Sequence, residues 1–460
     1  MEPVLKTGGQ QCLVGSNPTP SALSVDTKAS FMSELRPRDR GRAKVAGIAR
    51  HGRLKTGGPW KAILSIVATV AAVALVSSVG IASVLAYSVE KTVADNSIDI
   101  HTGEAEAVPP TIGAYPGGYN MLIVGSDTRA GQNGIGGDDG GSILNDVTML
   151  LHVSGDHQSA TAVSIPRDMV VPIPACAAGG PASGLPINNA LYYGGSTSDD
   201  PGAGLPCVVS TVEALTGLKI QFAGLLTFRG VIDMSNAVGG VNVCISAPIT
   251  DGYTGLNLPK AGTYKLKGTQ ALAFLRSRHG VGDGSDLGRI SSQQVYLSSL
   301  VRTLKSKDTL SDFTKLYSIG TAALKNMQLS SSLASLDTMV AIAQSLKDVP
   351  LEQVVFVQYP GTTGASGIFE GKVAPIQAKA DELFALIKAD KPFKLEDNTT
   401  DIGSVKNTAK PTKTAKPTKT PTSTATSTPT ATKTPKPIKN TLSGVPGQTA
   451  ADSTCAKANN

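Results

Sequence analysis

Arginine and aspartate recur in five short motifs of this 460-residue chain. A guanidinium group suits phosphate because its planar fork donates paired hydrogen bonds, and carboxylates bind hard divalent cations. A pyrophosphate needs several such donors plus a cation, since its charge increases locally during phosphoryl transfer. The residue types therefore indicate phosphoryl-transfer chemistry. The motifs are GSDTR (125–129), NDVT (145–148), SIPRD (164–168), FLRSR (274–278) and DLGR (286–289).

Asp127 and Asp146 are the predicted metal ligands. Asp127 follows the apolar run 120–126 and Asp146 precedes the run 147–154, so both carboxylates meet at one sheet end if these strands are neighbours. Two carboxylates, with the other positions left to water and phosphate oxygens, are how Mg²⁺ is usually held. The glycine-rich residues 130–144 between them are able to close over a ligand. For one isolated aspartate at a strand end, an ordinary turn or cap role is the commoner alternative.

The arginines are the predicted phosphate ligands. Arg276 and Arg278 are two residues apart, so an extended chain would point both guanidinium groups the same way, which is unfavourable unless an anion lies between them. Asp286, Arg289 and Gln293 are spaced i, i+3 and i+7, which places them on one face of a helix. A single arginine is more often a surface or salt-bridge residue, but the clustering favours a site. The full set is Arg129, Arg167, Arg276, Arg278 and Arg289.

Several common catalytic and metal-binding motifs are absent from the sequence. It contains no G-x-x-x-x-G-K-[ST] phosphate loop, no G-x-S-x-G elbow and no H-E-x-x-H, and its five histidines show no metal-ligand spacing. The five cysteines form no C-x-x-C pair, which argues against a zinc site. We expect Cys176 and Cys207 to form a bridge; with nearly equal weight, Cys176, Cys207 and Cys244 are three free buried thiols.

Alternating strands and helices must position these motifs. Short runs of branched apolar residues predict strands, and longer patterns predict helices, one of them ended by Gly217. Such alternation indicates an α/β domain with α–β–α layers around a mixed central sheet. The expected strands are 120–126, 147–154 and 159–166, the expected helices are 187–195 and 207–217, and 228–245 is expected to be a helix followed by a strand. A longer helix starts at Asp286 and has an apolar stripe of Ile290, Leu297, Val301 and Leu304.

Residues 62–87 predict one transmembrane helix. The segment has no charge over more than 20 residues, long enough to cross roughly 30 Å of hydrocarbon. Basic residues precede it and acidic ones follow it, so the positive-inside rule places the N-terminus in the cytoplasm and the later residues outside. A buried core helix and a cleaved signal peptide are the less favoured alternatives. The prediction is a single-pass cell-membrane protein with an extracytoplasmic domain.

The ends of the chain differ in charge from its middle. Residues 1–61 hold 11 Lys/Arg against 4 Asp/Glu, and 397–460 hold 9 against 3, whereas 62–396 hold 22 against 28. Because the part able to fold is mildly acidic, we expect no nucleic-acid partner. The Thr/Pro/Lys-rich tail lacks large apolar residues and is predicted to be disordered. The predicted segments are a leader (1–31) that precedes a true start at Met32, a cytoplasmic segment (32–61), the membrane helix (62–87), a stalk (88–115), the catalytic domain (116–395) and the tail (396–460).

The ordered set of motifs resembles the LytR–CpsA–Psr (LCP) family of cell-wall glycopolymer ligases. The resemblance covers 116–320 and, more loosely, the chain to about 395, and the cysteines and tail are similar to actinobacterial members. It is carried by LIVGSDTR, NDVTMLL, SIPRDM, INNALYYGG, VEALTGL, NAVGGVNV, FLRSRHG and DLGRISSQQ, in that order. Many members carry arginine where this chain has Leu144 and Ser292. This chain therefore has two fewer cations than those members for contacts with the ligand.

The resemblance implies a Mg²⁺-dependent phosphotransferase that moves a glycopolymer from a polyprenyl-pyrophosphate carrier onto peptidoglycan. Asp127 and Asp146 would hold Mg²⁺, and Asp286 would orient Arg289 or accept a proton. The pyrophosphate would be contacted by Arg129, Arg167, Arg276, Arg278, Arg289 and Gln293. A pyrophosphate hydrolase, a non-catalytic wall-binding anchor and a transcriptional attenuator are the alternatives; the cytoplasmic segment contains no helix-turn-helix and is too short for a DNA-binding domain.

Overall fold

The protein is described by a computed structural model, which covers residues 60, 63–69, 97–101, 116–129, 132, 135, 143–306, 309–396, 402–407, 438 and 440–459. The chain divides into two units, Met1–Val73 and Ala74–Asn460. In the first, residues 63–69 are helical. The described residues contain no helix that is both long enough and apolar enough to cross a bilayer. The leader and most of the predicted cytoplasmic, membrane and stalk segments lie outside them.

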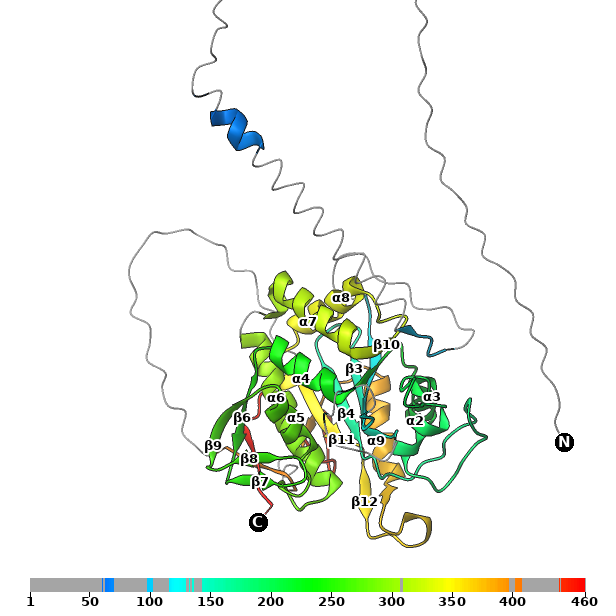
Figure 1. The fold of residues 1–460 in the computed structure, drawn as a ribbon. Helices are drawn as coiled ribbons and strands as arrows, with labels where there is room; N and C mark the ends of the chain where they lie inside the picture. Colours follow the sequence, from blue (N-terminus) through cyan, green and yellow to red (C-terminus); the bar gives the residue numbers. More distant parts are fainter. Residues whose placement is uncertain are drawn as a thin grey trace, which may run out of the picture. The chain divides into compact units, whose positions relative to one another are not determined.

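An eight-stranded mixed sheet forms the centre of the second unit (Figure 1). Its strand order is β1-β10-β5-β2-β3-β4-β11-β17, with β2 antiparallel to β3 and parallel to β5. The three predicted strands are confirmed as β2 (Tyr119–Ser126), β3 (Asn145–Val153) and β4 (Ala160–Ile165). The others are β1 (Ser97–Ile98), β5 (Phe222–Leu226), β10 (Met327–Ser330), β11 (Val354–Gln358) and β17 (Gly447–Thr449).

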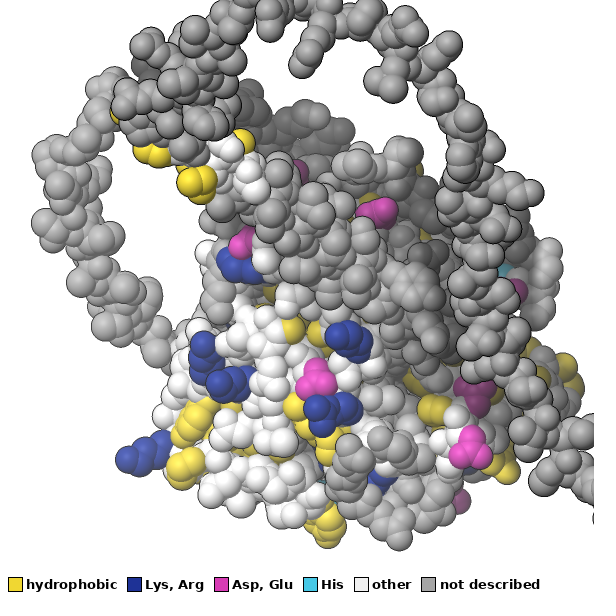
Figure 2. All heavy atoms as spheres, turned by 45° about the horizontal axis from the view of Figure 1, so that its top comes forward, with side chains coloured by type: hydrophobic (Ala, Val, Ile, Leu, Met, Phe, Trp, Pro, Cys, Tyr) yellow, Lys and Arg dark blue, Asp and Glu magenta, His cyan; other side chains and the backbone are white. Residues whose placement is uncertain are grey.

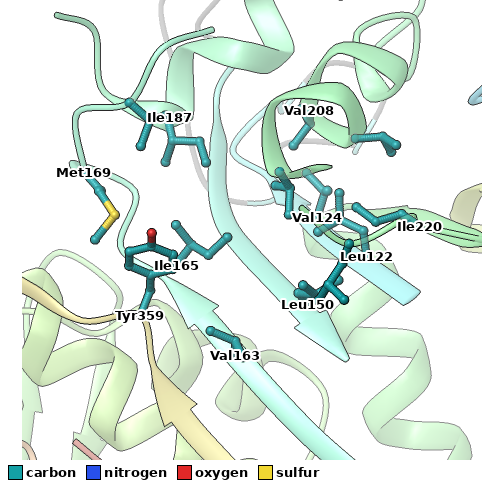
Figure 3. Close-up of a cluster of buried hydrophobic side chains, with 14 of the residues drawn as sticks. Leu122, Val124, Leu150, Val163, Ile165, Met169, Ile187, Val208, Ile220 and Tyr359 are labelled. Carbon is teal, nitrogen blue, oxygen red and sulfur yellow. The ribbon is translucent and has the colours of Figure 1, made fainter. Parts of the chain in front are cut away.

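Alternate residues of the strands point to opposite faces and bury two separate cores. On one face, Leu122, Val124 and Leu150 pack against α3 (Leu205–Thr216) and α9 (Gln377–Lys388), as Figure 3 shows for part of this cluster. On the other face, Met149 and Phe222 pack against residues of three further helices. These are α6 (Asp286–Ser306), α7 (Phe313–Asn326) and α8 (Leu336–Lys347). The predicted α–β–α layering is therefore confirmed.

The predicted helices form with small shifts at their ends. The helix expected at 207–217 is α3, which ends at Gly217, whose φ of 63° is the left-handed conformation that glycine adopts readily. The helix expected at 187–195 is split into a 3₁₀ turn, η1 (Ile187–Asn189), and the single turn α2 (Ala190–Tyr193). Residues 228–245 form α4 (Phe228–Ala237) and β6 (Val241–Ile245), as expected.

A second, four-stranded sheet packs against α5 (Thr269–Arg276) and α6, with the order β15-β18-β6-β9. The sequence did not predict it. Short two-stranded sheets complete the unit. The remaining bounds are β7 (Ile249–Asp251), β8 (Leu256–Leu258), β9 (Gly262–Leu266), β12 (Gly361–Thr363), β13 (Val373–Pro375), β14 (Phe393–Leu395), β15 (Ser404–Lys406), β16 (Asn440–Leu442) and β18 (Thr454–Ala456), with 3₁₀ turns η2 (Thr309–Ser311), η3 (Leu351–Gln353) and η4 (Gly367–Phe369).

The predicted disorder of 396–460 is wrong for residues 402–407 and 440–459. These residues form β15 to β18, and they bury Leu442, Val445 and Ala456. Composition averaged over the whole tail hid these few apolar side chains, which are enough to join a core that already exists. The Thr/Pro/Lys repeats at 408–437 lie outside the described residues. The stalk prediction is likewise wrong at 97–101, because Ser97–Ile98 joins the central sheet and Ile100 is buried.

Two disulfides cross-link the second unit. Cys176–Cys207 confirms the predicted bridge and excludes the free-thiol alternative. Cys244–Cys455, which the sequence did not predict, ties β6 to β18 across 211 residues of chain. Both belong to the kind of cross-link that persists in oxidising compartments.

The surface shown in Figure 2 is mixed in charge. Basic side chains lie there beside acidic and apolar ones, and neither sign of charge covers the described part of this face.

Candidate active site

A β-bulge at the end of β2 sets the position of Asp127. The register of β2 and β3 shifts between Gly125 and Ser126, and a Cβ on Gly125 would lie 3.0 Å from the Cβ of Val147, so the position favours glycine. Bulges redirect the following side chain. Asp127 Oδ1 accepts a hydrogen bond from the Leu144 amide at 2.6 Å, and the Asp127 amide donates to the Leu144 carbonyl at 3.1 Å. The two aspartate motifs are therefore neighbours, as predicted, and the contacts of Asp127 with Leu144 join two segments 17 residues apart.

Arg167 lies among three carboxylates. Its Nη1 is 2.5 Å from Asp146 Oδ1, and its Nε is 3.3 Å from Asp168 Oδ1. Burial disfavours the charge of Arg167, but Asp146, Asp168 and Asp286 outweigh this and raise its pKa. On the other side of Asp168, Arg278 Nη2 lies 4.0 Å from Oδ2. Asp168 therefore lies between two arginines, a role that its sequence position did not predict.

Asp286 and Arg289 form a buried pair at the start of α6. Arg289 Nη2 is 2.6 Å from Asp286 Oδ1, and their side chains are only 7% and 5% exposed. The same Nη2 donates to the Asp146 carbonyl at 2.8 Å, and Asp286 Oδ2 accepts from the Arg167 amide at 3.2 Å. Buried ions of this kind persist only when both partners are also hydrogen-bonded. The pair thus ties α6 to the ends of β3 and β4.

Arg276 differs from Arg167 and Arg289 because no Asp or Glu among the described residues lies within the 4.0 Å of an ion pair. It is the last residue of α5, so the expected extended conformation is wrong at this position; the chain becomes extended only at Ser277. Its guanidinium carbon lies 4.2 Å from the centroid of the Phe228 ring, a cation–π geometry. Burial, with repulsion by Arg129 and Arg289, lowers the pKa of Arg276 despite the attraction of Asp146 and Asp251. Arg276 is therefore close to other cations in a partly desolvated place.

The backbone around Arg276 and Arg278 is held by polar contacts from two elements. Gln293 Nε2 donates to the Leu275 carbonyl at 2.8 Å, so Gln293 supports the last turn of α5. Ser277 Oγ donates to Asp251 Oδ2 at 2.7 Å. Burial opposes ionisation of Asp251, but hydrogen bonds from Ser277 and from backbone amides outweigh it and lower the pKa of Asp251. Both contacts fix the positions of the two arginines.

The loop between Arg278 and Asp286 is paired with residues 454–459, which we call the C-terminal strap. The Gly282 amide donates to the Lys457 carbonyl at 2.9 Å, and the Asn459 amide donates to the Gly280 carbonyl at 3.1 Å. Asn459 Nδ2 donates to the His279 carbonyl at 3.0 Å. The strap is itself anchored through Cys455 to β6. Late residues of the chain thus hold the connection between two arginine motifs.

A model of the LytR_cpsA_psr family matches residues 83–390 of this sequence. The chain belongs to the LytR_cpsA_psr family. Within the family, it is 28% identical over 277 residues to the cell wall biosynthesis protein LcpA of Corynebacterium glutamicum, covering 54% of this chain and 51% of LcpA. It is 32% identical over 219 residues to the probable cell wall biosynthesis protein LcpB of the same organism, covering 46% and 48%. The chain thus spans about half the length of these curated relatives.

A further relative carries a chemically explicit name. The polyisoprenyl-teichoic acid–peptidoglycan teichoic acid transferase TagU of Enterococcus faecalis is 28% identical over 228 residues, which cover 49% of this chain and 64% of TagU. Among solved structures, an enzyme of the family from Actinomyces oris aligns with a TM-score of 0.45 at 20% identity, covering 62% of this chain and 94% of that one. Bacillus subtilis TagV aligns with a TM-score of 0.47 at 20% identity, covering 60% and 97%.

The two positions where this LytR_cpsA_psr chain departs from the expected arginine have other contacts. Leu144 uses its amide, which any residue possesses, to hold Asp127. Ser292 is buried, and its Oγ lies 3.4 Å from the Gly403 carbonyl, to which it donates. Gly403 packs against α6 so closely that a Cβ would lie 2.2 Å from the Gly288 carbonyl oxygen. A long side chain at position 292 would meet this segment.

Asp127 and Asp146 remain the predicted ligands of a divalent cation. Among the residues that the structure describes, no three or more His, Cys, Asp or Glu side chains come together as a metal-binding group. Mg²⁺ rarely needs such a cage, since it is usually bound by one or two carboxylates together with waters and substrate phosphates. One oxygen of each carboxylate is hydrogen-bonded, to Leu144 and to Arg167. Two carboxylates, beside arginines that can bind the oxygens of a phosphate ligand, fit the coordination of a hard cation.

The predicted site residues lie together around the ends of β2, β3 and β4 and the start of α6. Direct contacts join Asp146, Arg167, Arg278, Asp286 and Arg289, with Asp168 as the missed member. Electrostatic interaction links Arg276 to Arg129 and Arg289. The sequence also missed Phe228 and Asp251. For Asp168, the neighbouring Arg167 in SIPRD was a usable signal, whereas Phe228 and Asp251 meet the arginines only through the tertiary fold.

Proposed function

We propose that this chain is a Mg²⁺-dependent phosphotransferase that moves a glycopolymer from a polyprenyl-pyrophosphate carrier onto peptidoglycan. The observation that carries the proposal is Arg276, a partly buried cation placed beside other cations with no carboxylate within 4.0 Å among the described residues. Such an arrangement is unfavourable until an anion joins it. The name of TagU supplies the type of donor and acceptor.

The residues would divide the work between binding and positioning. Arg276, Arg278 and Arg129 would contact the diphosphate oxygens and stabilise the charge that grows there during transfer. Arg167 and Arg289, already paired with Asp146 and Asp286, would keep the cluster in place. Mg²⁺, held by Asp127 and Asp146, would neutralise phosphate charge when bound.

The proposed reaction is a displacement at the sugar-linked phosphorus. A peptidoglycan hydroxyl oxygen attacks this phosphorus, a new P–O bond forms, and the bond to the bridging oxygen breaks. Polyprenyl phosphate leaves with that bond's electron pair, and the hydroxyl proton passes to a nearby base. Asp286 is less suited to accept it than the sequence alone allowed, because it is 5% exposed and paired with Arg289. It is better suited to orienting Arg289.

The proposed location is the outer side of the cell membrane, with residues 62–87 as the single span. The two disulfides support an oxidising location for the domain. The apolar side chains Ile63, Leu64, Ile66 and Val67 are exposed on the described helical turn, which suits a lipid environment.

The test is a transfer assay with the full chain in detergent. A synthetic polyprenyl-pyrophosphate glycan would be incubated with and without peptidoglycan, and the products identified by mass spectrometry. A glycan–phosphate–peptidoglycan product is expected. Release of free glycan phosphate whether or not peptidoglycan is present would instead identify a hydrolase. No turnover of the donor would indicate a wall-binding or regulatory protein.

The same assay would be run on the variant Arg276→Ala. Its matched control is Arg229→Ala, because Arg229 lies on neighbouring α4 but is 53% exposed and paired with Asp233.

A further inference from the structure

A hollow of about 720 Å³ opens beside α2, outside the arginine cluster. Its volume falls in the range typical of small-molecule sites. Two tyrosines and several glycines form much of its wall, and none of its lining residues is charged. The lining residues are Ala178, Gly179, Gly180, Pro181, Ala182, Tyr192, Tyr193, Gly195, Ser196 and Thr197.

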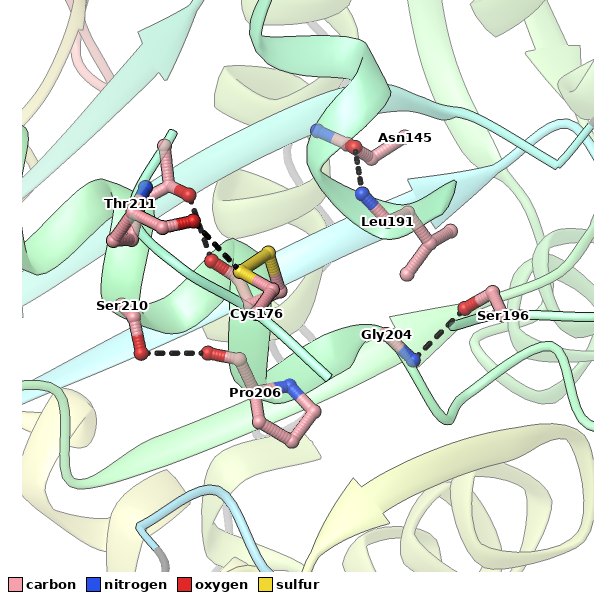
Figure 4. The surroundings of a disulfide bond; sticks show 10 residues. Asn145, Cys176, Leu191, Ser196, Gly204, Pro206, Ser210 and Thr211 are labelled. Carbon is pink, nitrogen blue, oxygen red and sulfur yellow. Dashed lines mark hydrogen bonds between the residues drawn. A yellow bond between two sulfur atoms is a disulfide. The ribbon is translucent and has the colours of Figure 1, made fainter. Parts of the chain in front are cut away.

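The wall of this hollow is held firmly by cross-links and close packing. The Cys176–Cys207 disulfide joins the loop before the hollow to the start of α3, and Figure 4 shows its surroundings. The Ala178 amide donates to the Tyr193 carbonyl at 3.2 Å. A Cβ on Gly179 would lie 3.1 Å from the Tyr193 ring, so the ring rests directly on the backbone there. The hollow is therefore a formed feature of the fold.

Tyr192 presents its ring to solvent at the edge of the hollow. The side chain is 62% exposed, and its ring lies edge-on to that of Tyr193, with centroids 6.3 Å apart at 76°. An exposed aromatic ring held on a short rigid turn offers an apolar face and a hydroxyl group at little entropic cost. The apolar C–H faces of a sugar ring stack on such a surface, while its hydroxyl groups bond to nearby backbone and side-chain groups.

The residues just before Tyr192 are hydrogen-bonded to residues of the candidate active site. The Leu191 amide, one residue before Tyr192, donates to Asn145 Oδ1 at 3.1 Å (Figure 4). Asn145 is next to Asp146, a predicted metal ligand. The Asn188 amide donates to the Arg167 carbonyl at 3.2 Å. The turn that carries Tyr192 is therefore bonded both to the start of β3 and to the residue that follows the SIP end of β4.

We propose that this hollow is a glycan subsite, in which one or two uncharged sugar rings of a wall polysaccharide stack on Tyr192. The proposal rests on the function proposed above and adds to it the group that recognises the sugar rather than the phosphate. The absence of charge on the lining favours neutral sugar rings over phosphate or carboxylate groups. The sugar belongs either to the peptidoglycan acceptor or to the glycopolymer of the donor, which offer the same ring chemistry.

The experiment measures binding of soluble glycans without a pyrophosphate. The full chain in detergent would be titrated by calorimetry and ligand-observed NMR with a peptidoglycan disaccharide-peptide in one arm and a lipid-free, phosphate-free glycopolymer repeat in the other. We expect one of the two to bind, and Tyr192→Ala to weaken its binding about tenfold. Tyr192→Phe should retain most of the affinity, since it keeps the ring.

A matched control comes from Tyr253, which is 82% exposed and stacks on His279 with ring centroids 4.4 Å apart. Tyr253→Ala should bind both glycans as the wild type does. If neither glycan binds, or if Tyr192→Ala binds as tightly as the wild type, the subsite is refuted.

The two proposals fail in distinguishable ways. Arg276→Ala should lower transfer about 100- to 1,000-fold but leave glycan binding unchanged, because the proposed partner of Arg276 is the phosphate. Glycan binding that depends on Tyr192, in a protein without transfer activity, would refute only the proposed function. Transfer with an unchanged KM for both substrates in Tyr192→Ala would refute only the subsite.

Discussion

Arg276 and Arg289 lie in the same cluster but differ in how their charge is balanced. Arg289 is 7% exposed, 2.6 Å from Asp286 and hydrogen-bonded to the Asp146 carbonyl. Arg276 stacks on Phe228 and is repelled by neighbouring arginines, with no ion pair among the described residues. Arg289 is thus already paired with an anion, whereas Arg276 has no such partner among the described residues. On the proposed function, the comparison predicts that Arg289 positions the site and that Arg276 binds the ligand.

The predicted metal ligands, Asp127 and Asp146, give the sharpest test of ligand binding by the cluster. Asp127→Ala should reduce transfer to background, because a diphosphate beside several arginines still needs a cation to react. Chelation by EDTA should abolish wild-type transfer, and added Mg²⁺ should restore it, in the same mass-spectrometric assay. Undiminished transfer after exhaustive chelation would remove the metal from the mechanism and leave the arginines to act alone.

Arg276→Ala should lower transfer by about 100- to 1,000-fold, the usual effect of losing one donor that stabilises transition-state charge. Its melting temperature should stay at or slightly above the wild-type value, because the variant relieves repulsion in the unliganded protein. Rates and thermal unfolding would be measured together, with Arg229→Ala as the control. A large loss of stability would place Arg276 with the positioning residues and break the comparison.

Asp286→Asn, unlike Arg276→Ala, should lower the stability of the fold strongly. Removing one partner of a buried ion pair leaves Arg289 uncompensated, which costs about 3–5 kcal/mol of unfolding free energy. Transfer should fall in step with the folded population and with loss of Arg289 orientation. Urea unfolding is the measurement. A variant as stable as the wild type but inactive would instead make Asp286 a catalytic group.

Breaking the Cys244–Cys455 disulfide should loosen the loop between the two arginines. We expect the double variant Cys244→Ala/Cys455→Ala to exchange the Gly282 amide proton faster, because this amide bonds to Lys457 in the strap. Transfer should fall about tenfold as the arginines lose their preorganisation. Exchange at Gly282 equal to that of the wild type would show that the strap stays in place without the bond.

Asp251 should make the smallest contribution to the stability of the fold, and this contribution should depend on pH. Its folded-state pKa is lowered, so its ionised form stabilises the fold above the unfolded value of about 3.9, and this stabilisation is lost as pH falls through the folded value. Asp251→Asn should therefore be less stable than the wild type at pH 7, by about 1–3 kcal/mol. The gap should narrow at pH 3; a constant gap would exclude ionisation as its cause.

Sequence patterns predicted the parts of this fold that local residues decide. The runs at 120–126 and 147–154 have strand periodicity, and the five short arginine and aspartate motifs contain nearly the whole cluster. What escaped prediction depends on contacts between distant segments. Phe228 meets Arg276 from another helix, and Asp251 reaches Ser277 from a separate hairpin.

Residues 440–459 show most clearly that local sequence patterns do not predict contacts between distant segments. Cys455 pairs with a cysteine 211 residues earlier, and no local pattern specifies such a partner. Arg276 also ends a helix, although its spacing from Arg278 suggested an extended strand. A two-residue spacing cannot distinguish a strand from a helix end, because only the surrounding packing decides it.

The C-terminal strap has a consequence for the order in which the protein matures. The ribosome makes residues 440–459 after every other described residue, yet β18 from this segment is an interior strand between β15 and β6. Until these residues emerge, the second sheet keeps an open edge and the loop at Gly280 and Gly282 lacks its hydrogen-bonding partners. The contacts that hold the loop between Arg278 and Asp286 therefore form only after residues 454–459 have been made.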